Sequence, residues 1–328
     1  MFLYKIFNNN NPVVFILMPV LLILVWAKTL YTGSFTVFHS ESIPMPFYEW
    51  TNMLTFNNTL ASLFAGLLLV ALQTALVIRL NIKYIIIENR SYLPAFLFIL
   101  LMGSYVHLQR LHPALCANIF MIWALDKVLA SYKTHKALSG IFDASLLISC
   151  ASLFYLNAAF LIVFIWIGFL IVKSLKPYEF ILSLLGFITP YFFVASYYYL
   201  TDKITFFTDT LIVNFQIKNT ILVWNNYHLI LFSFIGLMFL AAVLYYVQGV
   251  NMKKIAIRRF YLIFILFVPA TAAIFVLQAS SSVEIFTFLA MPVAYLLSYL
   301  LISIRKFWVK EIWLDVFLIL LVLQQILG

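Results

Sequence analysis

The sequence predicts an all-α, polytopic integral membrane protein, and three observations lead to this fold class. Of the 328 residues, 65% are hydrophobic and only 9% are charged, whereas a soluble domain carries about 25% charged residues. Eleven apolar stretches follow one another along the chain. The Lys and Arg residues between them fall almost entirely on alternate connections, which is typical of a multi-pass protein.

Each apolar stretch is interpreted as a membrane-spanning helix. Such a helix needs about 20 apolar residues, because the hydrocarbon layer is about 30 Å thick and a helix rises about 1.5 Å per residue. Barrel strands are excluded because the apolar runs do not alternate with polar residues. The predicted helices are residues 13–31, 59–82, 92–106, 113–131, 140–155, 157–175, 178–200, 226–248, 260–278, 283–304 and 311–327.

The distribution of positive charge predicts the orientation of these helices. All but four of the 20 Lys and Arg residues lie in or beside the N-terminal segment and the even-numbered connections; the exceptions are Lys28, Arg110, Lys203 and Lys218. Positive residues stay on the cytoplasmic side during insertion. We therefore predict a bacterial inner-membrane protein with a cytoplasmic N-terminus and a periplasmic C-terminus. The net charge of +9 is then a topology signal, and it requires no nucleic-acid partner.

Residues 1–328 are expected to form a single membrane domain, because no linker, low-complexity tract or obvious repeat divides them. Two predicted outer connections, 32–58 and 201–225, are longer than the others and rich in aromatic and apolar residues. Segments of this kind lie along the headgroup layer as interfacial helices or re-entrant turns. We predict that residues 44–54 and part of 204–224 do so and cover a cavity within the membrane.

Charged residues inside the predicted helices are few and lie near the helix ends. Asp126 and Asp143 are expected near the cytoplasmic surface, where they extend to water or pair with Lys133 or Lys136. The sequence therefore gives little support to a chain of intramembrane acids that relays protons. Cys116 also falls within a predicted helix and is expected to be a buried thiol.

The third connection carries one of the four outward positive charges between two imidazoles. Arg110 is flanked by His107 and His112. A guanidinium group matches the geometry of phosphate oxygens, and a neutral imidazole donates or accepts a proton near pH 7. We interpret these residues as a lipid-phosphate or carboxylate site, with an ordinary polar turn as the alternative. The spacing of the two His residues matches no metal site, and we expect neither a metal nor a cofactor.

Five acids lie on the same predicted side: Glu41, Glu49, Asp202, Asp209 and Glu284. A carboxylate in an aromatic, partly dry environment can have a raised pKa and act as a general base. Glu41 and Glu49, in the first long outer connection, are the candidate catalytic residues. The alternative for each acid is a solvated position on a loop.

Four segments resemble a Bacteroidota family of multi-pass proteins of unknown function. They are Asn89-Arg90-Ser91-Tyr92-Leu93-Pro94, His112-Pro113-Ala114-Leu115-Cys116-Ala117-Asn118, Ile141-Phe142-Asp143-Ala144 and Thr189-Pro190-Tyr191. The similarity spans much of residues 80–200, and it implies a membrane protein without indicating an activity.

The architecture also resembles that of the C-type glycosyltransferases, which share an inside N-terminus, an acidic first outer loop and short-looped helices. This resemblance implies a polyprenyl-phosphate-linked substrate and a catalytic acid in the first outer loop. Only Glu41 and Glu49 match that position, and the chain lacks the adjacent acidic pair that is usual in these enzymes.

Three functions follow from these observations. The first is a lipid-phosphate-dependent transferase that opens to the periplasm, with Glu41 or Glu49 close to Arg110 in one pocket. The second is a non-catalytic scaffold or partner subunit of a cell-envelope complex, with membrane lipids and other envelope proteins as its partners. A transporter comes third, because the sequence shows no repeats or paired broken helices.

Overall fold

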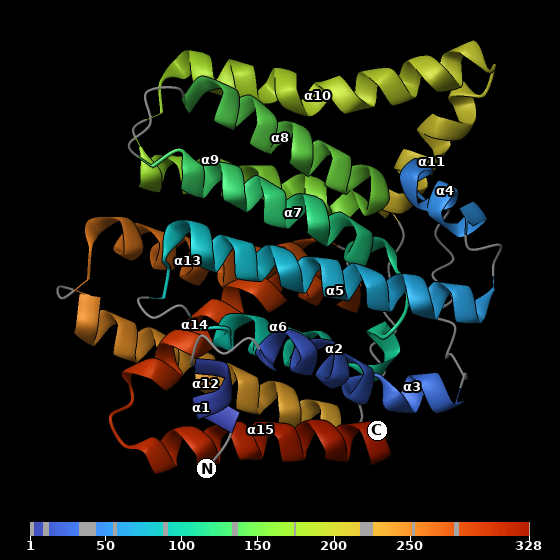
Figure 1. Cartoon of the computed structure of the whole chain (residues 1–328). Helices are drawn as coiled ribbons and strands as arrows, with labels where there is room; N and C mark the ends of the chain where they lie inside the picture. Colours follow the sequence, from blue (N-terminus) through green and yellow to red (C-terminus); the bar gives the residue numbers. More distant parts are fainter. Residues whose placement is uncertain are drawn as a thin grey trace.

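The computed structural model describes residues 3–8, 13–32, 44–54, 58–87, 91–132, 137–173, 175–216, 226–250, 253–278 and 282–327, and within these ranges every regular element is a helix. Most of the long helices run side by side along one direction (Figure 1). In chain order they are α1 (Leu3–Asn8), α2 (Val13–Val25), α3 (Ala27–Thr32), α4 (Pro46–Leu54), α5 (Thr59–Tyr84), α6 (Leu93–Met102), η1 (Val106–Leu108), α7 (Pro113–Ala130), α8 (Ala137–Phe154), η2 (Leu156–Phe160), α9 (Leu161–Val172), α10 (Pro177–Leu200), α11 (Ile204–Gln216), α12 (Asn226–Gly249), α13 (Ile255–Leu277), η4 (Val283–Leu289), α14 (Ala290–Ser303) and α15 (Phe307–Leu327).

The all-helical fold class is confirmed, and each of the eleven predicted ranges is helical over most of its length. Several boundaries differ: the ninth and eleventh predicted helices begin earlier than expected, at Ile255 and Phe307, and the sixth ends earlier, at Val172. The first predicted helix is interrupted at Trp26, which separates α2 from α3. The third was expected to extend to residue 106 but ends at Met102, because Gly103 and Ser104 close it with hydrogen bonds to the carbonyl groups of Ile99 and Leu101.

Six helices are long and apolar enough to cross a membrane: α5, α7, α10, α12, α13 and the continuous η4–α14 segment. Four shorter apolar helices accompany them, at Val13–Val25, Leu93–Met102, Ser139–Phe154 and Leu156–Val172. These helices identify a membrane protein. The number of eleven crossings and the orientation of the bundle remain predictions.

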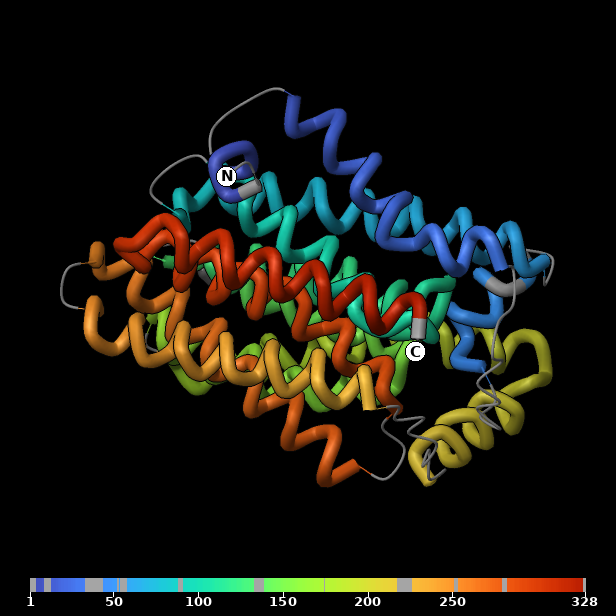
Figure 2. Tube along the Cα trace, turned by 90° about the horizontal axis from the view of Figure 1, so that it is seen from below, coloured from blue at the N-terminus to red at the C-terminus, as the bar shows by residue number. Residues whose placement is uncertain are grey.

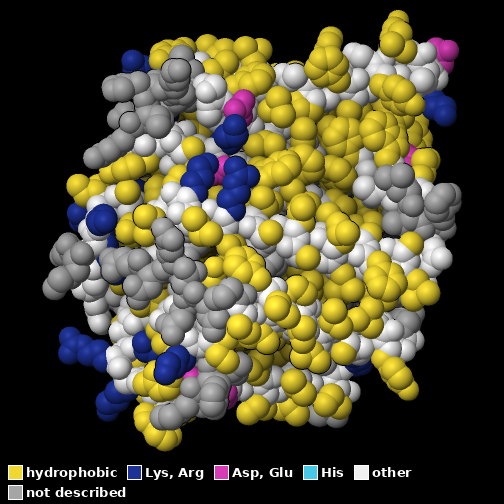
Figure 3. All heavy atoms as spheres, viewed as in Figure 1, with side chains coloured by type: hydrophobic (Ala, Val, Ile, Leu, Met, Phe, Trp, Pro, Cys, Tyr) yellow, Lys and Arg dark blue, Asp and Glu magenta, His cyan; other side chains and the backbone are white. Residues whose placement is uncertain are grey.

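The interior of the bundle is formed by α6 and α14, whose side chains are buried almost all around. In contrast, α10 and α12 expose many large apolar side chains, including Phe192, Phe193 and Leu240. Figure 3 shows that apolar side chains also cover the middle of the molecule, where α5 lies in Figure 1, with most of the visible Lys and Arg side chains toward the left edge. A chain surrounded by lipid gains nothing from hiding apolar residues, so packing rather than hydrophobicity selects the interior helices.

The two long outer connections contain helices α4 and α11, which lie at the same end of the bundle in both views (Figures 1 and 2). Phe47 of α4 and Phe207 of α11 join an aromatic and aliphatic cluster with Leu153 of α8 and with Val194 and Tyr198 of α10. The two helices therefore pack against the ends of α8 and α10. Their position at a membrane surface remains a prediction.

Candidate functional site

The connection between α6 and α7, residues 103–112, is folded into the bundle. Its Gln109 side chain is 0% exposed. The amide nitrogen of Gln109 donates to the carbonyl oxygens of Val25 (3.2 Å) and Gly103 (3.0 Å), and its amide oxygen accepts from the hydroxyl of Thr29 (2.5 Å). The hydrogen bonds with Val25 and Thr29 hold the connection against α2 and α3, and the bond to Gly103 joins two parts of the connection itself.

Two glycines allow the backbone of this connection to pack so closely. A Cβ atom on Gly103 would lie 1.9 Å from a side-chain atom of α2, and a Cβ atom on Gly66 of α5 would lie 2.9 Å from the carbonyl carbon of Arg110. In addition, the N–H of Leu111 donates to the carbonyl oxygen of Ser62 on α5 at 3.2 Å. The surface of α5 therefore fixes the position of Arg110.

His112 caps the start of α7 and is buried, with 2% of its side chain exposed. Its Nδ1 atom accepts a hydrogen bond from the N–H of Leu115 at 3.3 Å. Burial, together with the positive charge of Arg110, lowers the pKa of His112 from 6.5 to about 3. The imidazole is therefore neutral at physiological pH, with its proton on Nε2.

Glu284, in the first turn of η4, is the acid next to this imidazole. Its Oε2 atom lies 3.8 Å from Nδ1 of His112, and its side chain is 16% exposed. The two groups do not form an ion pair at neutral pH, because His112 Nδ1 already accepts a hydrogen bond and carries no proton. The carboxylate instead accepts a hydrogen bond from the N–H of Ala114 at the start of α7, and it interacts electrostatically with Arg110.

Tyr48 of α4 covers this group. Its hydroxyl donates to the carbonyl oxygen of Leu111 at 3.3 Å, and α4 is anchored nearby through the edge-to-face contact of Phe47 with Phe154, whose ring centroids are 5.3 Å apart. Burial and the neighbouring charge of Glu284 raise the pKa of Tyr48 well above 10. The phenol stays protonated and can donate a hydrogen bond to an anion.

An apolar cavity of about 210 Å³ is lined in part by His112. Its wall is mostly aliphatic and aromatic, and the polar side chains in it belong to His112, Ser104, Tyr105 and Thr287. The cavity is lined by Trp26, Val70, Leu101, Met102, Ser104, Tyr105, Leu108, His112, Leu115, Phe232, Ile235, Gly236, Phe239, Val268, Val283, Phe286, Thr287, Leu289, Ala290 and Val293. A mostly apolar wall with a few polar groups is the usual form of a site for a small organic ligand.

A second polar cluster borders the same cavity through Tyr105. The ring of Tyr105 lies 5.2 Å from that of His107 and 4.9 Å from that of His228 on α12, and the two imidazoles stack at 5.8 Å. Burial and the positive charges of Lys28 and Arg110 lower the pKa of His107. The positive charges of Lys28 and Arg110 therefore both act on His107.

The structure brings three of the predicted site residues into one region and places a fourth, Glu49, elsewhere. The positive charge of Arg110 acts on both His107 and His112. Glu49 follows Tyr48 on α4 but points about 100° away around the helix, where its charge acts on Tyr198 of α10. Glu41 lies outside the described residues. The acid that accompanies Arg110 is Glu284.

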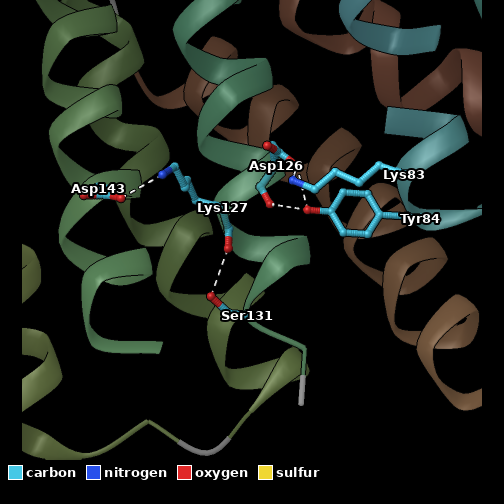
Figure 4. A network of polar contacts seen from close by, with 6 residues as sticks. All are labelled: Lys83, Tyr84, Asp126, Lys127, Ser131 and Asp143. Carbon is cyan, nitrogen blue, oxygen red and sulfur yellow. Dashed lines mark hydrogen bonds and ion pairs between the residues drawn. The ribbon is translucent and has the colours of Figure 1, made fainter. Parts of the chain in front are cut away.

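The acids near the opposite end of the bundle form structural ion pairs, with partners other than those expected. Lys83 and Tyr84 both bind Asp126, at 2.7 and 2.6 Å, and Lys127 binds Asp143 at 2.7 Å (Figure 4). The predicted partners Lys133 and Lys136 lie outside the described residues. Lys83 reaches Asp126 because α5 packs beside α7, and Lys127 reaches Asp143 because α7 packs beside α8. Among the described residues, no group of three or more His, Cys, Asp or Glu is arranged to hold a metal ion.

Sequence reasoning missed three members of the site, namely Tyr48, Tyr105 and His228. Tyr48 was one of several aromatic residues in the first outer connection, and His228 was interpreted as part of an apolar helix. The signal that could have singled out His228 is its imidazole at the outer start of a predicted span, since polar groups are costly there.

Comparison with known proteins gives one match. Residues 41–327 match the model of a family of unknown function, DUF6427. No curated protein and no solved structure matches the chain. The resemblance to an uncharacterised family is confirmed, whereas the resemblance to C-type glycosyltransferases remains a prediction.

Proposed function

We propose that this membrane protein, which belongs to the family of unknown function DUF6427, binds a lipid with an anionic, phosphate-bearing headgroup. The headgroup binds at the end of the bundle that is predicted to be periplasmic. The observation that carries the proposal is the cavity of about 210 Å³ whose mostly apolar wall includes His112, on which the positive charge of Arg110 acts. An acyl or prenyl tail fits such a wall, and a guanidinium group pairs with phosphate oxygens.

The polar groups around Arg110 have the protonation states that binding of a phosphate requires. His112 keeps its Nε2 proton and can donate a hydrogen bond. Tyr48 keeps its phenolic proton, and it would donate to the phosphate by giving up its long hydrogen bond to Leu111. Only Arg110 adds positive charge here, and the nearby carboxylate of Glu284 balances it in the absence of ligand. Exchange of this internal partner for a phosphate would let the site bind and release its ligand.

Among the functions that involve binding of a lipid phosphate, the position of Glu284 favours a transferase. In such a reaction its carboxylate takes the proton from an acceptor hydroxyl, and the acceptor oxygen bonds to the group that the lipid carries. The bond between that group and the phosphate oxygen breaks, and the phosphate leaves with the electron pair beside Arg110. The resemblance to C-type glycosyltransferases suggests a polyprenyl phosphate as the lipid, with Glu284 in the role that the sequence assigned to Glu41 or Glu49.

The experiment is quantification of the phospholipid and prenyl-phosphate content of the purified full chain by mass spectrometry. Gly236 lines the cavity, and a Cβ atom there would meet nothing within 4 Å; Gly236→Trp therefore fills the cavity. Leu237→Trp is the matched control, because Leu237 is 55% exposed on the same helix. Arg110→Ala removes the phosphate partner.

Wild type and Leu237→Trp are expected to retain a specific lipid phosphate, and Gly236→Trp and Arg110→Ala are expected to lose it. Both variants should still unfold cooperatively, at a lower midpoint because the bound lipid no longer stabilises the folded protein. The same lipid content in all four proteins would overturn the proposal. Co-purification of a stoichiometric protein without any specific lipid would favour the partner-subunit function instead.

A further inference from the structure

The imidazole of His228 is a buried polar group that the site around Arg110 does not use. His228 is 1% exposed, and within the described parts of the chain neither of its ring nitrogens has a hydrogen-bond partner. A buried polar group without a partner is destabilising by about 1–3 kcal/mol, so such groups usually mark a ligand or a functional role. The neighbouring rings of Tyr105 and His107 hold the imidazole in place.

Positive charge also gathers at this second cluster. Lys28 on α3 acts electrostatically on His107 and on His228. The next residue, Thr29, donates its hydroxyl hydrogen to Gln109 at 2.5 Å, which holds α3 against the connection that carries His107 and Arg110. Lys28 and Arg110 are two of the four positive charges that the sequence assigns to the outer side.

This cluster is poorly suited to bind a metal ion. His107 and His228 supply only two nitrogen atoms, whereas a structural metal site usually takes four protein ligands. The ammonium group of Lys28 would also repel a cation. An oxyanion, in contrast, accepts hydrogen bonds from imidazole N–H groups and is attracted by the ammonium group.

We propose that the lipid headgroup carries two anionic groups, of which one binds at Arg110 and the other at Lys28 and His228. This inference rests on the proposed lipid-binding function and specifies its ligand as a lipid diphosphate or a lipid with two adjacent anionic groups. Both clusters border one cavity, since Tyr105 and His112 both line it. Lys28 and Arg110 also both act electrostatically on His107, so a single headgroup beside His107 faces both cations.

Farnesyl diphosphate and farnesyl monophosphate test the inference, because they share one tail and differ by one phosphate. Their dissociation constants are measured with the full chain in nanodiscs, for wild type, Lys28→Gln and His228→Phe. Lys203→Gln is the control, because it removes another predicted outer charge, beside α11. Thermal unfolding midpoints show which variants are folded.

Wild type is expected to bind the diphosphate at least about tenfold more tightly than the monophosphate, because a charge-assisted hydrogen bond contributes about 1.5–3 kcal/mol. Lys28→Gln and His228→Phe should remove this preference, and Lys203→Gln should keep it. Equal binding of the two probes by wild type would overturn the inference and leave the proposed function intact. Failure to bind either probe would overturn the proposed function as well.

Discussion

Nδ1 of His112 and Oε2 of Glu284 lie 3.8 Å apart, and His112 forms part of the wall of an apolar cavity. The imidazole is kept neutral by burial and by Arg110, so the carboxylate finds its opposite charge in the guanidinium group. An incoming anion must compete with Glu284 for Arg110. This competition distinguishes Glu284 from the other outer acids.

Replacement of Glu284 by Gln is expected to strengthen the binding of an anionic lipid. The carboxylate competes with the ligand for Arg110, and the uncharged amide does not, so the affinity should rise about three- to tenfold, or about 0.7–1.4 kcal/mol. Binding of a lipid phosphate to the purified variant in nanodiscs measures the effect. Glu49→Gln is the control, because Glu49 acts on Tyr198. A loss of affinity in Glu284→Gln with an unchanged fold would contradict the competition.

The stability of the protein is expected to decrease as the pH is lowered from about 6.5 toward 3, in part because of His112. Its pKa is about 3 in the folded protein and near 6.5 when exposed. In this interval the unfolded chain binds a proton that the folded chain does not, so the free energy of unfolding falls by about 1.4 kcal/mol per pH unit.

His112→Asn tests this pH dependence, because Asn caps a helix but does not titrate. The thermal unfolding midpoint of the variant should change less between pH 6.5 and pH 4.5 than that of wild type. Parallel curves for the two proteins would show that His112 does not contribute.

Gly66→Ala is expected to displace the connection that carries Arg110. The new Cβ atom would lie 2.9 Å from the carbonyl carbon of Arg110 and 3.1 Å from Cη2 of Trp26, and such overpacking costs about 1–3 kcal/mol. The change should lower both the unfolding midpoint and the affinity for lipid. Gly236→Ala, which meets nothing within 4 Å, should leave the midpoint unchanged or raise it, since Ala favours the helix. Equal midpoints in the two variants would refute the close approach.

The helical ranges could be predicted from the sequence because a run of about 20 apolar residues is a strong local signal. The end of α6 could not, since it depends on packing. Gly103 lies so close to α2 that a Cβ atom would be 1.9 Å from Val25, and Gln109 bonds the following turn to Val25 and Thr29. None of these contacts is visible in the order of the residues.

The site was predictable only in part, for a similar reason. Arg110 stood out because positive charges are rare on the outer side, and its neighbours His107 and His112 came with it. Glu284 was one of five outer acids, and no spacing separated it from Glu49. Its proximity to His112 arises because η4 packs against α7, which is a property of the tertiary fold.

The two ion pairs in Figure 4 are expected to differ in their contribution to stability. Asp126 is 18% exposed and bonds to both Lys83 and Tyr84, so Asp126→Ala should cost about 1–3 kcal/mol. Asp143 and its partner Lys127 are 40% and 41% exposed, and Asp143→Ala should cost less than about 1 kcal/mol. Thermal unfolding in one detergent gives the comparison. A larger effect at Asp143 would contradict the ranking by burial.

The orientation of the bundle is the last prediction, and the ion pairs help to define it. Lys83 at the end of α5 binds Asp126 near the end of α7, so both helices end on the same side. Between them, α6 is only 10 residues long, or about 15 Å, and the buried connection 103–112 completes the passage toward the start of α7. The chain therefore travels away from this side and returns, as a pair of crossings would.

Reporter fusions measure the outcome directly. Fusions after Lys136 and after Arg259 are expected to be cytoplasmic, because these positions follow the basic connections. Fusions at Ser42 and after the last helix are expected to be periplasmic. A cytoplasmic C-terminus would mean that the chain crosses the membrane an even number of times. Since the ion pair between Lys83 and Asp126 requires the passage through α6, the miscounted crossing would then lie in another segment of the chain.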